Sequence, residues 1–379
     1  MWCCCDSVVE WTESLGLVCM GNKWKKPIVG VDLFAGAGGM SLGARMAGID
    51  VQLAIEKDPH AAETYAHNNP QTRVVVGDVA HVKEIGVSKR GKVSVLFGGP
   101  PCQGFSTSNQ RTRSSGNEVN WLFREFARIV RLWMPDWVVF ENVRGIVETE
   151  GGAFRDKILA ELEKSGYTTA DGVLCAADFG VPQRRSRFFV IASLDGVAVD
   201  LPKASAHRVV TVRQAISDLP ALPNGADADY MSYPRKARSQ YAKAMRNGKA
   251  GCRNHLVTAN APRILDRYKH IPQGGNWEDI PERLMNNYTD RTRCHTGIYH
   301  RLHEDSPSVV IGNFRKNMLV HPTQDRGLSV REAARLQSFP DCYEFIGSIG
   351  FQQQQVGNAV PPFLAKAVFE TILSRENRT

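Results

Sequence analysis

Apolar strand-like segments alternate with helical segments from Pro27 to about Asp195, and this alternation constrains the fold more than any other feature of the chain. The order favours an α/β protein with a mostly parallel sheet and helices on its faces. In the segment WLFREFARIVRLW, the apolar positions form one helical stripe. The predicted strands lie near 28–34, 51–56, 74–76, 93–97, 137–141 and 187–193, and the predicted helices near 40–47, 59–67, 121–133 and 153–165.

The alternation stops beyond Asp195. Residues 200–325 are rich in Pro, Asn, Arg and His, a composition typical of a second, less regular domain. Order returns with a predicted helix over 329–337, capped by Ser329, and with a final helix near 361–374. A chain of 379 residues is long enough for one large domain or two moderate ones.

Composition narrows the class of protein. No run of 18 apolar residues occurs, and the amino terminus lacks the basic-then-apolar order of a signal peptide, so we expect a cytosolic protein. The 9 cysteines follow neither a zinc pattern nor a disulfide framework, and we expect reduced thiols and no bound metal. The net charge is +8, and residues 235–253 hold seven basic side chains and no acidic one. This stretch is either a phosphate-binding face or a solvated basic helix.

The first 26 residues do not match the rest of the chain, because MWCCC and the residues after it show no clear period. Met20 opens MGNKWKKPIVGVDLF, which resembles a natural start just ahead of the first strand. We therefore expect translation to begin at Met20, with residues 1–19 an upstream extension or a loosely attached tail. The intact mass of protein expressed from its native start decides between Met1 and Met20.

A cysteine follows two prolines in GGPPCQGFS, residues 98–106. Pro100 and Pro101 restrict the backbone that presents Cys102 beyond the carboxyl end of a predicted strand, where open α/β sheets bind ligands. The stretch alone leaves two alternatives open. Cys102 is either a rigidly aimed nucleophile or a buried cysteine that acts as a small hydrophobic residue.

A glycine-rich turn in VDLFAGAGGMSLG, residues 31–43, lies between a predicted strand and a predicted helix. Such a turn lets a ligand approach the backbone closely. The dinucleotide fingerprint G-x-G-x-x-G fails at Ser41, which argues against a nicotinamide cofactor. Glu56 and Asp78 end the next two strands, and together they suit the ribose hydroxyls and the amine of an adenosine-bearing ligand. Singly, each is more typical of a surface or capping residue.

Two further motifs contain side chains suited to chemistry. WVVFENV ends with Glu141 and Asn142, and a carboxyl group at the edge that holds Cys102 could act as an acid or a hydrogen-bond partner. A capping Asn and an exposed Glu are the alternative. In QRRSR, Arg185 and Arg187 are two apart, so we predict both on one strand face, where paired guanidinium groups suit a phosphate or a carbonyl oxygen.

Six motifs in order resemble those of the DNA (cytosine-5)-methyltransferase family, of the bacterial restriction-modification type. They are FAGAGG, GGPPCQGFS, ENV, QRRSR, REAARLQSFPD (331–341) and QVGNAVPP (355–362), and the resemblance runs from about Pro27 to the end except near 225–300. It implies a Rossmann-like S-adenosylmethionine-dependent methyltransferase domain with a smaller irregular target-recognition domain. The implied divisions are an extension or tail at 1–26, a catalytic and cofactor-binding domain at 27–195, a target-recognition domain at 196–345 and a return to the catalytic domain at 346–379.

The resemblance also implies a reaction and its residues. The methyl group of S-adenosylmethionine is transferred to carbon 5 of a cytosine that is flipped out of a specific double-stranded DNA sequence. Cys102 matches the nucleophile that adds to carbon 6, Glu141 the contact to ring nitrogen 3 and the amino group, Arg187 the contact to the carbonyl oxygen, and Arg185 a support for the target nucleotide. The matching cofactor contacts are Phe34, Gly36, Gly38, Glu56, Asp78, Pro100, Leu122 and Asn358. The expected DNA contacts are Gln103, Ser106, Arg111, Arg113, Arg235, Lys236 and Arg238.

Three rival functions remain at this point. A tRNA cytosine-5 methyltransferase shares the Pro-Pro-Cys and Glu-Asn-Val motifs, but its Cys-Phe-Thr signature is absent here. An inactive DNA-binding homologue is disfavoured by the intact motifs, and an NAD-dependent oxidoreductase by Ser41. We expect a monomer that acts on double-stranded DNA in the cytoplasm, associated with the nucleoid, without a membrane. A cognate restriction endonuclease, where there is one, would act separately.

Overall fold

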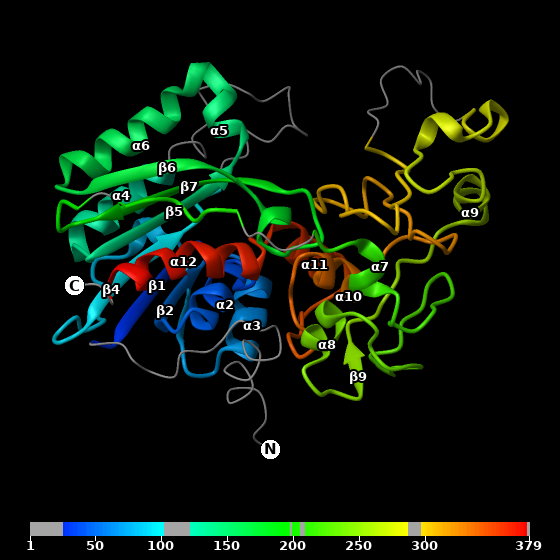
Figure 1. The fold of residues 1–379 in the computed structure, drawn as a ribbon, viewed down its shortest axis with the longest axis horizontal. Helices are drawn as coiled ribbons and strands as arrows, with labels where there is room; N and C mark the ends of the chain where they lie inside the picture. Colours follow the sequence, from blue (N-terminus) through cyan, green and yellow to red (C-terminus); the bar gives the residue numbers. More distant parts are fainter. Residues whose placement is uncertain (1–25, 102–121, 198, 205–208, 287–296, 377–379) are drawn as a thin grey trace. The chain divides into compact units, whose positions relative to one another are not determined.

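The structure is a computed structural model that describes residues 26–101, 122–197, 199–204, 209–286 and 297–376. The described chain divides into two compact units. We call the first the sheet unit; its described residues lie within 26–179, 186–206 and 360–376. The second, the irregular unit, comprises described residues of 180–185 and 207–359. Figure 1 shows the chain coloured along its sequence.

A seven-stranded sheet forms the centre of the sheet unit, in the order β3-β2-β1-β4-β5-β7-β6. The strands are β1 (Ile28–Leu33), β2 (Asp50–Glu56), β3 (Arg73–Val76), β4 (Val93–Gly98), β5 (Trp137–Val143), β6 (Thr168–Cys175) and β7 (Ser186–Ser193). All pairs from β3 to β5 are parallel, whereas β7 runs antiparallel to both of its neighbours. The prediction of an α/β protein with a mostly parallel sheet is confirmed. The edge strand β6 was not predicted, because TTADGVLC has no apolar run and most of its residues are half-buried.

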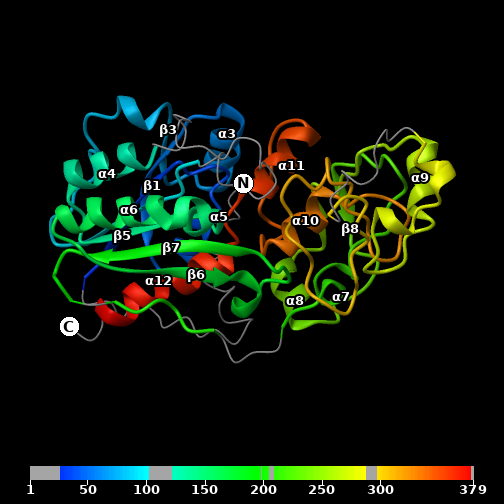
Figure 2. The same ribbon diagram turned by 90° about the horizontal axis from the view of Figure 1, so that it is seen from above.

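Helices cover both faces of this sheet. They are α2 (Gly39–Met46), α3 (Pro59–Asn68), α4 (Leu122–Trp133), α5 (Gly145–Glu148), α6 (Ala153–Lys164) and α12 (Pro362–Glu376), with short 3₁₀ turns at Val79–His81, Thr149–Gly152 and Ala176–Phe179. Figure 2 shows α4 and α6 on one face and α12 on the other. The predicted stripe of α4 enters the core, where Phe126 packs edge-on against Phe140 of β5. On the opposite face, Phe369 of α12 packs against Phe97 of β4.

The irregular unit contains short elements joined by long connections. They are α7 (Val212–Ile216), β8 (Tyr230–Ser232), α8 (Gln240–Arg246), β9 (Gly251–Arg253), α9 (Pro262–Tyr268), α10 (Val330–Leu336), α11 (Ile349–Asn358) and 3₁₀ turns at Trp277–Asp279 and Glu282–Leu284. The predicted cap of α10 is confirmed, because the Ser329 side chain accepts from the Glu332 amide and Glu332 accepts from the Ser329 amide. Helix α11 was not predicted, since a run of four glutamines shows no apolar period, although three glutamines of α11 are buried.

The two units differ from the predicted divisions at three places, and residues 196–206 group with the sheet unit rather than with the irregular unit. Residues 180–185 and residues 346–359 group with the irregular unit, and the chain rejoins the sheet unit only at Val360. The chain was predicted to return to the catalytic domain at residue 346, which is earlier than Val360, where it rejoins the sheet unit. The assignment of catalytic and target-recognition roles to these parts remains a prediction.

Candidate active site

The carboxyl ends of β1, β4 and β5 approach one another so closely that only glycine fits at the end of β4 and directly after it. A Cβ on Gly98 would lie 2.1 Å from the Leu33 carbonyl oxygen, and one on Gly99 would lie 2.5 Å from Oε2 of Glu141. The Asn142 side-chain amide donates to the Pro100 carbonyl at 3.0 Å, so Asn142 holds the turn rather than capping a helix. The residues that follow, including Cys102, Gln103, Ser106, Arg111 and Arg113, lie outside the described residues.

An ion pair joins β5 to β7 beside this turn. Nε of Arg187 lies 2.9 Å from Oε1 of Glu141, and the two side chains are only 12% and 10% exposed. Burial lowers the pKa of Arg187, and the charge of Glu141 partly offsets this effect. Since the two groups fix each other's orientation, the pair offers a hydrogen-bonding edge to a planar polar ring. The alternative of an exposed Glu141 is wrong, because the residue is buried.

Arg185 does not share a strand face with Arg187, and that prediction is wrong. Strand β7 begins at Ser186, and Arg185 belongs to the irregular unit. Its buried guanidinium donates to the carbonyls of Ile311 at 3.0 Å and Gly357 at 2.9 Å. Arg185 therefore joins two segments of the irregular unit that are far apart in the sequence.

The glycine-rich turn after β1 is built for close approach. Phe34, Gly36 and Gly38 all have positive φ angles, of 56°, 55° and 86°. A Cβ placed on Gly36 would meet no heavy atom within 4 Å, so the turn faces open space there. The Gly36 amide donates to Oε2 of Glu56 at 2.7 Å, which fixes that carboxylate beside the turn. Such a cradle fits a ligand that needs backbone contact and an acidic partner.

The second predicted acid lies after β3. Oδ2 of Asp78 accepts from Lys57 at 2.8 Å, and Oδ1 accepts from the Ala80 amide at 3.0 Å. The hydrogen bond from Lys57 lowers the pKa of Asp78, so this residue is a carboxylate at neutral pH. Both acids lie at the carboxyl ends of parallel strands of one sheet, as predicted, and both have exposed atoms. Leu122 is half-buried at the start of α4, and Asn358 is exposed at the end of α11.

A buried hydroxyl chain under the glycine turn was not anticipated. Tyr65 donates to Ser41 at 2.6 Å, and Ser41 donates to Asp32 at 2.6 Å. All three side chains are buried, and burial raises the pKa of Asp32 to about 8. Ser41, the residue at which the dinucleotide fingerprint fails, thus forms buried hydrogen bonds with Tyr65 and Asp32. The only signal in the sequence was an Asp inside an otherwise apolar strand.

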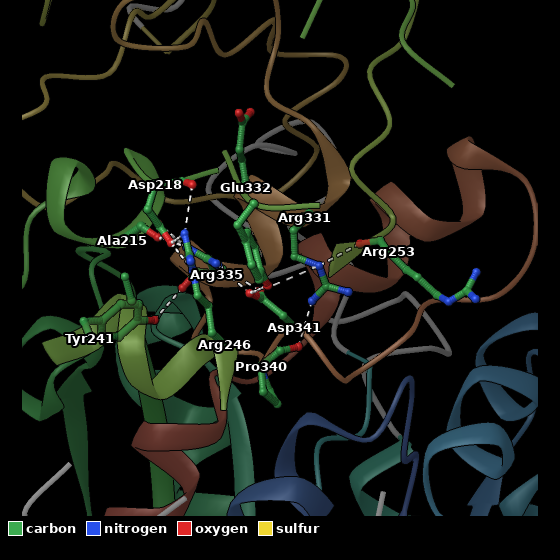
Figure 3. Close-up of polar contacts among 12 residues, drawn as sticks. Ala215, Asp218, Tyr241, Arg246, Arg253, Arg331, Glu332, Arg335, Pro340 and Asp341 are labelled. Atoms are coloured by element: carbon green, nitrogen blue, oxygen red, sulfur yellow. Dashed lines mark hydrogen bonds and ion pairs between the residues drawn. The ribbon is translucent and has the colours of Figure 1, made fainter. Parts of the chain in front are cut away.

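The motif REAARLQSFPD lies in the interior of the irregular unit (Figure 3). Arg335 donates to both carboxylate oxygens of Asp341, at 2.8 and 2.6 Å, and to Asp218 at 2.5 Å. Arg331 donates to the carbonyls of Pro340 and Tyr343 at 2.7 and 2.6 Å. The motif therefore stabilises the unit through buried charge pairs.

The predicted basic stretch 235–253 is only partly a surface. Arg235, Lys236 and Arg238 are exposed, as a phosphate-binding face requires. Arg246, in contrast, is buried and donates to Asp218 at 2.6 Å. The described residues contain no group of three or more His, Cys, Asp or Glu side chains that could hold a metal ion. Within the same residues, no helix combines the length and apolar character needed to cross a membrane.

Comparison with known proteins gives a consistent match along the chain. A family model described as C-5 cytosine-specific DNA methylase matches residues 28–374. The chain is 38% identical to the type II methyltransferase M1.HphI of Haemophilus parahaemolyticus, over 90% of this chain and 86% of that protein. It is 35% identical to the type II methyltransferase M.DdeI of Desulfomicrobium norvegicum, over 90% and 88%. A solved E. coli structure, described as a DNA modification methyltransferase encoded within a prophage, matches with a TM-score of 0.74 and 26% identity, over 92% of this chain and 99% of that one.

Proposed function

The chain belongs to the C-5 cytosine-specific DNA methylase family and transfers a methyl group to carbon 5 of cytosine in DNA, and on this premise we propose that Cys102, Glu141 and Arg187 carry out the reaction. The observation that carries the proposal is the partly buried pair of Glu141 and Arg187, 2.9 Å apart, beside the turn that leads to Cys102. This pair has the donors and acceptors that a pyrimidine ring requires.

The Cys102 thiolate adds to carbon 6 of the target cytosine. Glu141 donates to, or shares a proton with, ring nitrogen 3, and so stabilises the charge that develops as sulfur attacks. Arg187 holds Glu141 in place and donates to the carbonyl oxygen of the base. Because a free thiol has a pKa of about 8.5, the site must favour the thiolate. After carbon 5 has received the methyl group, loss of its proton and elimination of the thiolate restore the aromatic ring and the free enzyme.

S-adenosylmethionine is the proposed methyl donor, and it supplies an electrophilic methyl group when bound. The open turn at Gly36 supports this proposal, as do the two acids at the ends of β2 and β3. Glu56 would accept from the ribose hydroxyls, and Asp78 from the adenine amine. The full proposed set is Phe34, Gly36, Gly38, Glu56, Asp78, Pro100, Leu122 and Asn358.

Double-stranded DNA with a specific recognition sequence is the proposed substrate. A cytosine inside a duplex is out of reach of a thiol, so the base must be flipped out at a cost of a few kcal/mol. Gln103 and Ser106 would face the base, and Arg111, Arg113, Arg235, Lys236 and Arg238 would contact phosphates. Arg185 would support the target nucleotide indirectly, through the segments that it joins. We propose that the enzyme acts as a monomer and that any cognate endonuclease acts separately.

Transfer of tritium from labelled S-adenosylmethionine to genomic DNA or tRNA, followed by bisulfite sequencing, tests this function. Wild type should label cytosines within one short DNA motif, and Cys102→Ala should label none. Glu141→Gln should lower kcat by roughly 10²–10⁴-fold. Glu161→Gln is the matched control, because this exposed carboxylate pairs with Arg131 away from the turn, and it should retain wild-type rates. Label in tRNA alone would overturn the DNA assignment, and binding without label would indicate an inactive homologue.

A further inference from the structure

Arg246 closes a basic loop in the irregular unit. Its Nη1 donates to the Arg235 carbonyl at 2.8 Å, so the two ends of the segment 235–246 are joined. The sequence between these ends, RKARSQYAKAMR, contains no acidic residue. We call this segment the basic loop. It contains helix α8, which Ser239 caps, and the guanidinium that joins its two ends is itself buried.

The basic loop presents cations that no carboxylate neutralises. Arg235, Lys236, Arg238 and Lys243 are exposed, and within the described chain none of them forms an ion pair with an acid. Some other exposed cations of the same unit do have such partners. Arg213 pairs with Glu304 and Asp305, Arg253 with Asp229 and Glu344, and Lys269 with Asp266. Unneutralised cations gathered in one short segment suit a polyanion.

The buried end of the loop is rigidly held. The Arg246 guanidinium stacks on Tyr233, with 3.7 Å between its carbon and the ring centroid, and Nε donates to Asp218 at 2.6 Å. Asp218 also accepts from Arg335, which links the loop to the charge network of Figure 3. The Tyr233 hydroxyl donates to Asp341 in the same network. A planar guanidinium can stack on a ring and donate hydrogen bonds in its own plane at once, whereas a lysine ammonium has no plane to stack.

We propose that Arg246 is a positioning residue that holds the basic loop against the DNA backbone without touching DNA, and that Lys243 is one of the phosphate contacts in that loop. The inference rests on the proposed function, because the polyanion it names is the DNA substrate. Arg246 sets how many phosphates the loop neutralises at once. Its own charge is already matched by Asp218.

The dependence of DNA affinity on salt tests this assignment. Binding of the full chain to a short duplex of mixed sequence is measured over a range of salt concentrations, since log K falls with log salt at a slope of about 0.9 per phosphate contact. Lys243→Gln should make the slope shallower by about 0.9. Arg246→Gln and Arg246→Lys should each make it shallower by about 2 or more, because several contacts become disordered together. Loss of folded protein alone lowers the active concentration and leaves the slope unchanged.

Tyr233→Phe is the matched control. It removes a hydrogen bond from the same network but keeps the ring under Arg246, so the slope should equal that of wild type. An unchanged slope in Arg246→Gln, or a fall no larger than that of Lys243→Gln, would overturn the positioning role. A Tyr233→Phe slope as shallow as that of Arg246→Gln would overturn it too, because general loosening would then be the cause. Methyl transfer by wild type, measured on genomic DNA, separates failure of this inference from failure of the proposed function.

Discussion

The two units bury different kinds of side chain. The largest fully buried side chains of the sheet unit are aromatic, whereas those of the irregular unit include five arginines. The former are Trp137, Tyr65, Phe97 and Phe126, and the latter are Arg185, Arg267, Arg326, Arg331 and Arg335. A regular sheet satisfies its own backbone hydrogen bonds and needs only apolar contacts between its layers. A unit made of long connections has many backbone carbonyls to satisfy, and a guanidinium with five N–H groups can bond several at once.

Loss of Arg335 should have the largest effect on stability and should be confined to the irregular unit. Arg335→Met leaves Asp341 and Asp218 without their shared guanidinium, and removing one partner of a buried ion pair costs about 3–5 kcal/mol. Amide hydrogen exchange followed by peptide should show this loss in α10, with β4 unchanged. Phe126→Ala is the reciprocal variant, with a similar expected loss confined to the sheet unit. Equal losses in both units for either variant would show that the two interiors do not act separately.

A change in pH should also affect the stability of the two units in opposite directions. Burial lowers the pKa of His321 from 6.5 to about 4, so the folded irregular unit keeps this residue neutral. Between those two values the unfolded chain binds a proton that the folded chain does not, and stability therefore falls as the pH drops through this range, by about 3 kcal/mol. The contribution of Asp32 to the stability of the sheet unit has the opposite pH dependence. Its raised pKa, about 8, means that stability falls as the pH rises from about 4 toward 8.

Hydrogen exchange at pH 5 and pH 8, corrected for intrinsic rates, measures both effects. Peptides of the irregular unit should open more readily at the lower pH, and those around α2 at the higher pH. His321→Asn should weaken the first dependence without abolishing it, because burial also lowers the pKa values of His255 and His300 in the same unit. Asp32→Asn should remove most of the second. Identical pH dependence in the two units, or dependence that neither substitution weakens, would contradict this account.

The sheet unit could be predicted closely from the sequence, because buried parallel strands have apolar runs that end in turns. That pattern also placed Glu56, Asp78 and Glu141 at or near the carboxyl ends of strands, where the structure has them. The edge strand β6 was missed for the same reason, since a half-buried strand has no such run. The apolar pattern of the sequence therefore predicts the strands that are fully buried by other elements, and it misses those that are half-exposed.

The interior of the irregular unit could not be predicted, because a charged residue in a sequence does not show whether it is buried. Arg246 was one of seven basic residues in an apparently solvated stretch, and its partner Asp218 lies 28 positions away. Arg335 meets Asp218 across 117 positions. Arg185 was misassigned in the same way, since its partners are backbone carbonyls of residues 126 and 172 positions away. Pairing over such distances leaves no local pattern in the sequence.

The smallest effect expected concerns the close contact between α2 and α12, which come from opposite ends of the chain of the sheet unit. A Cβ on Gly43 would lie 2.5 Å from Cβ of Ala365 and 2.6 Å from the Pro362 carbonyl oxygen. Because a backbone atom cannot move aside cheaply, Gly43→Ala should separate the helices at a net cost of about 1–3 kcal/mol, measured by hydrogen exchange in α2 and α12. Gly77→Ala, which would meet no atom within 4 Å, should change stability by less than about 0.5 kcal/mol. Since alanine favours a helix over glycine by about 1 kcal/mol, a stabilised Gly43→Ala would mean that this contact yields easily, and close packing would then not be what holds α12 to the sheet unit.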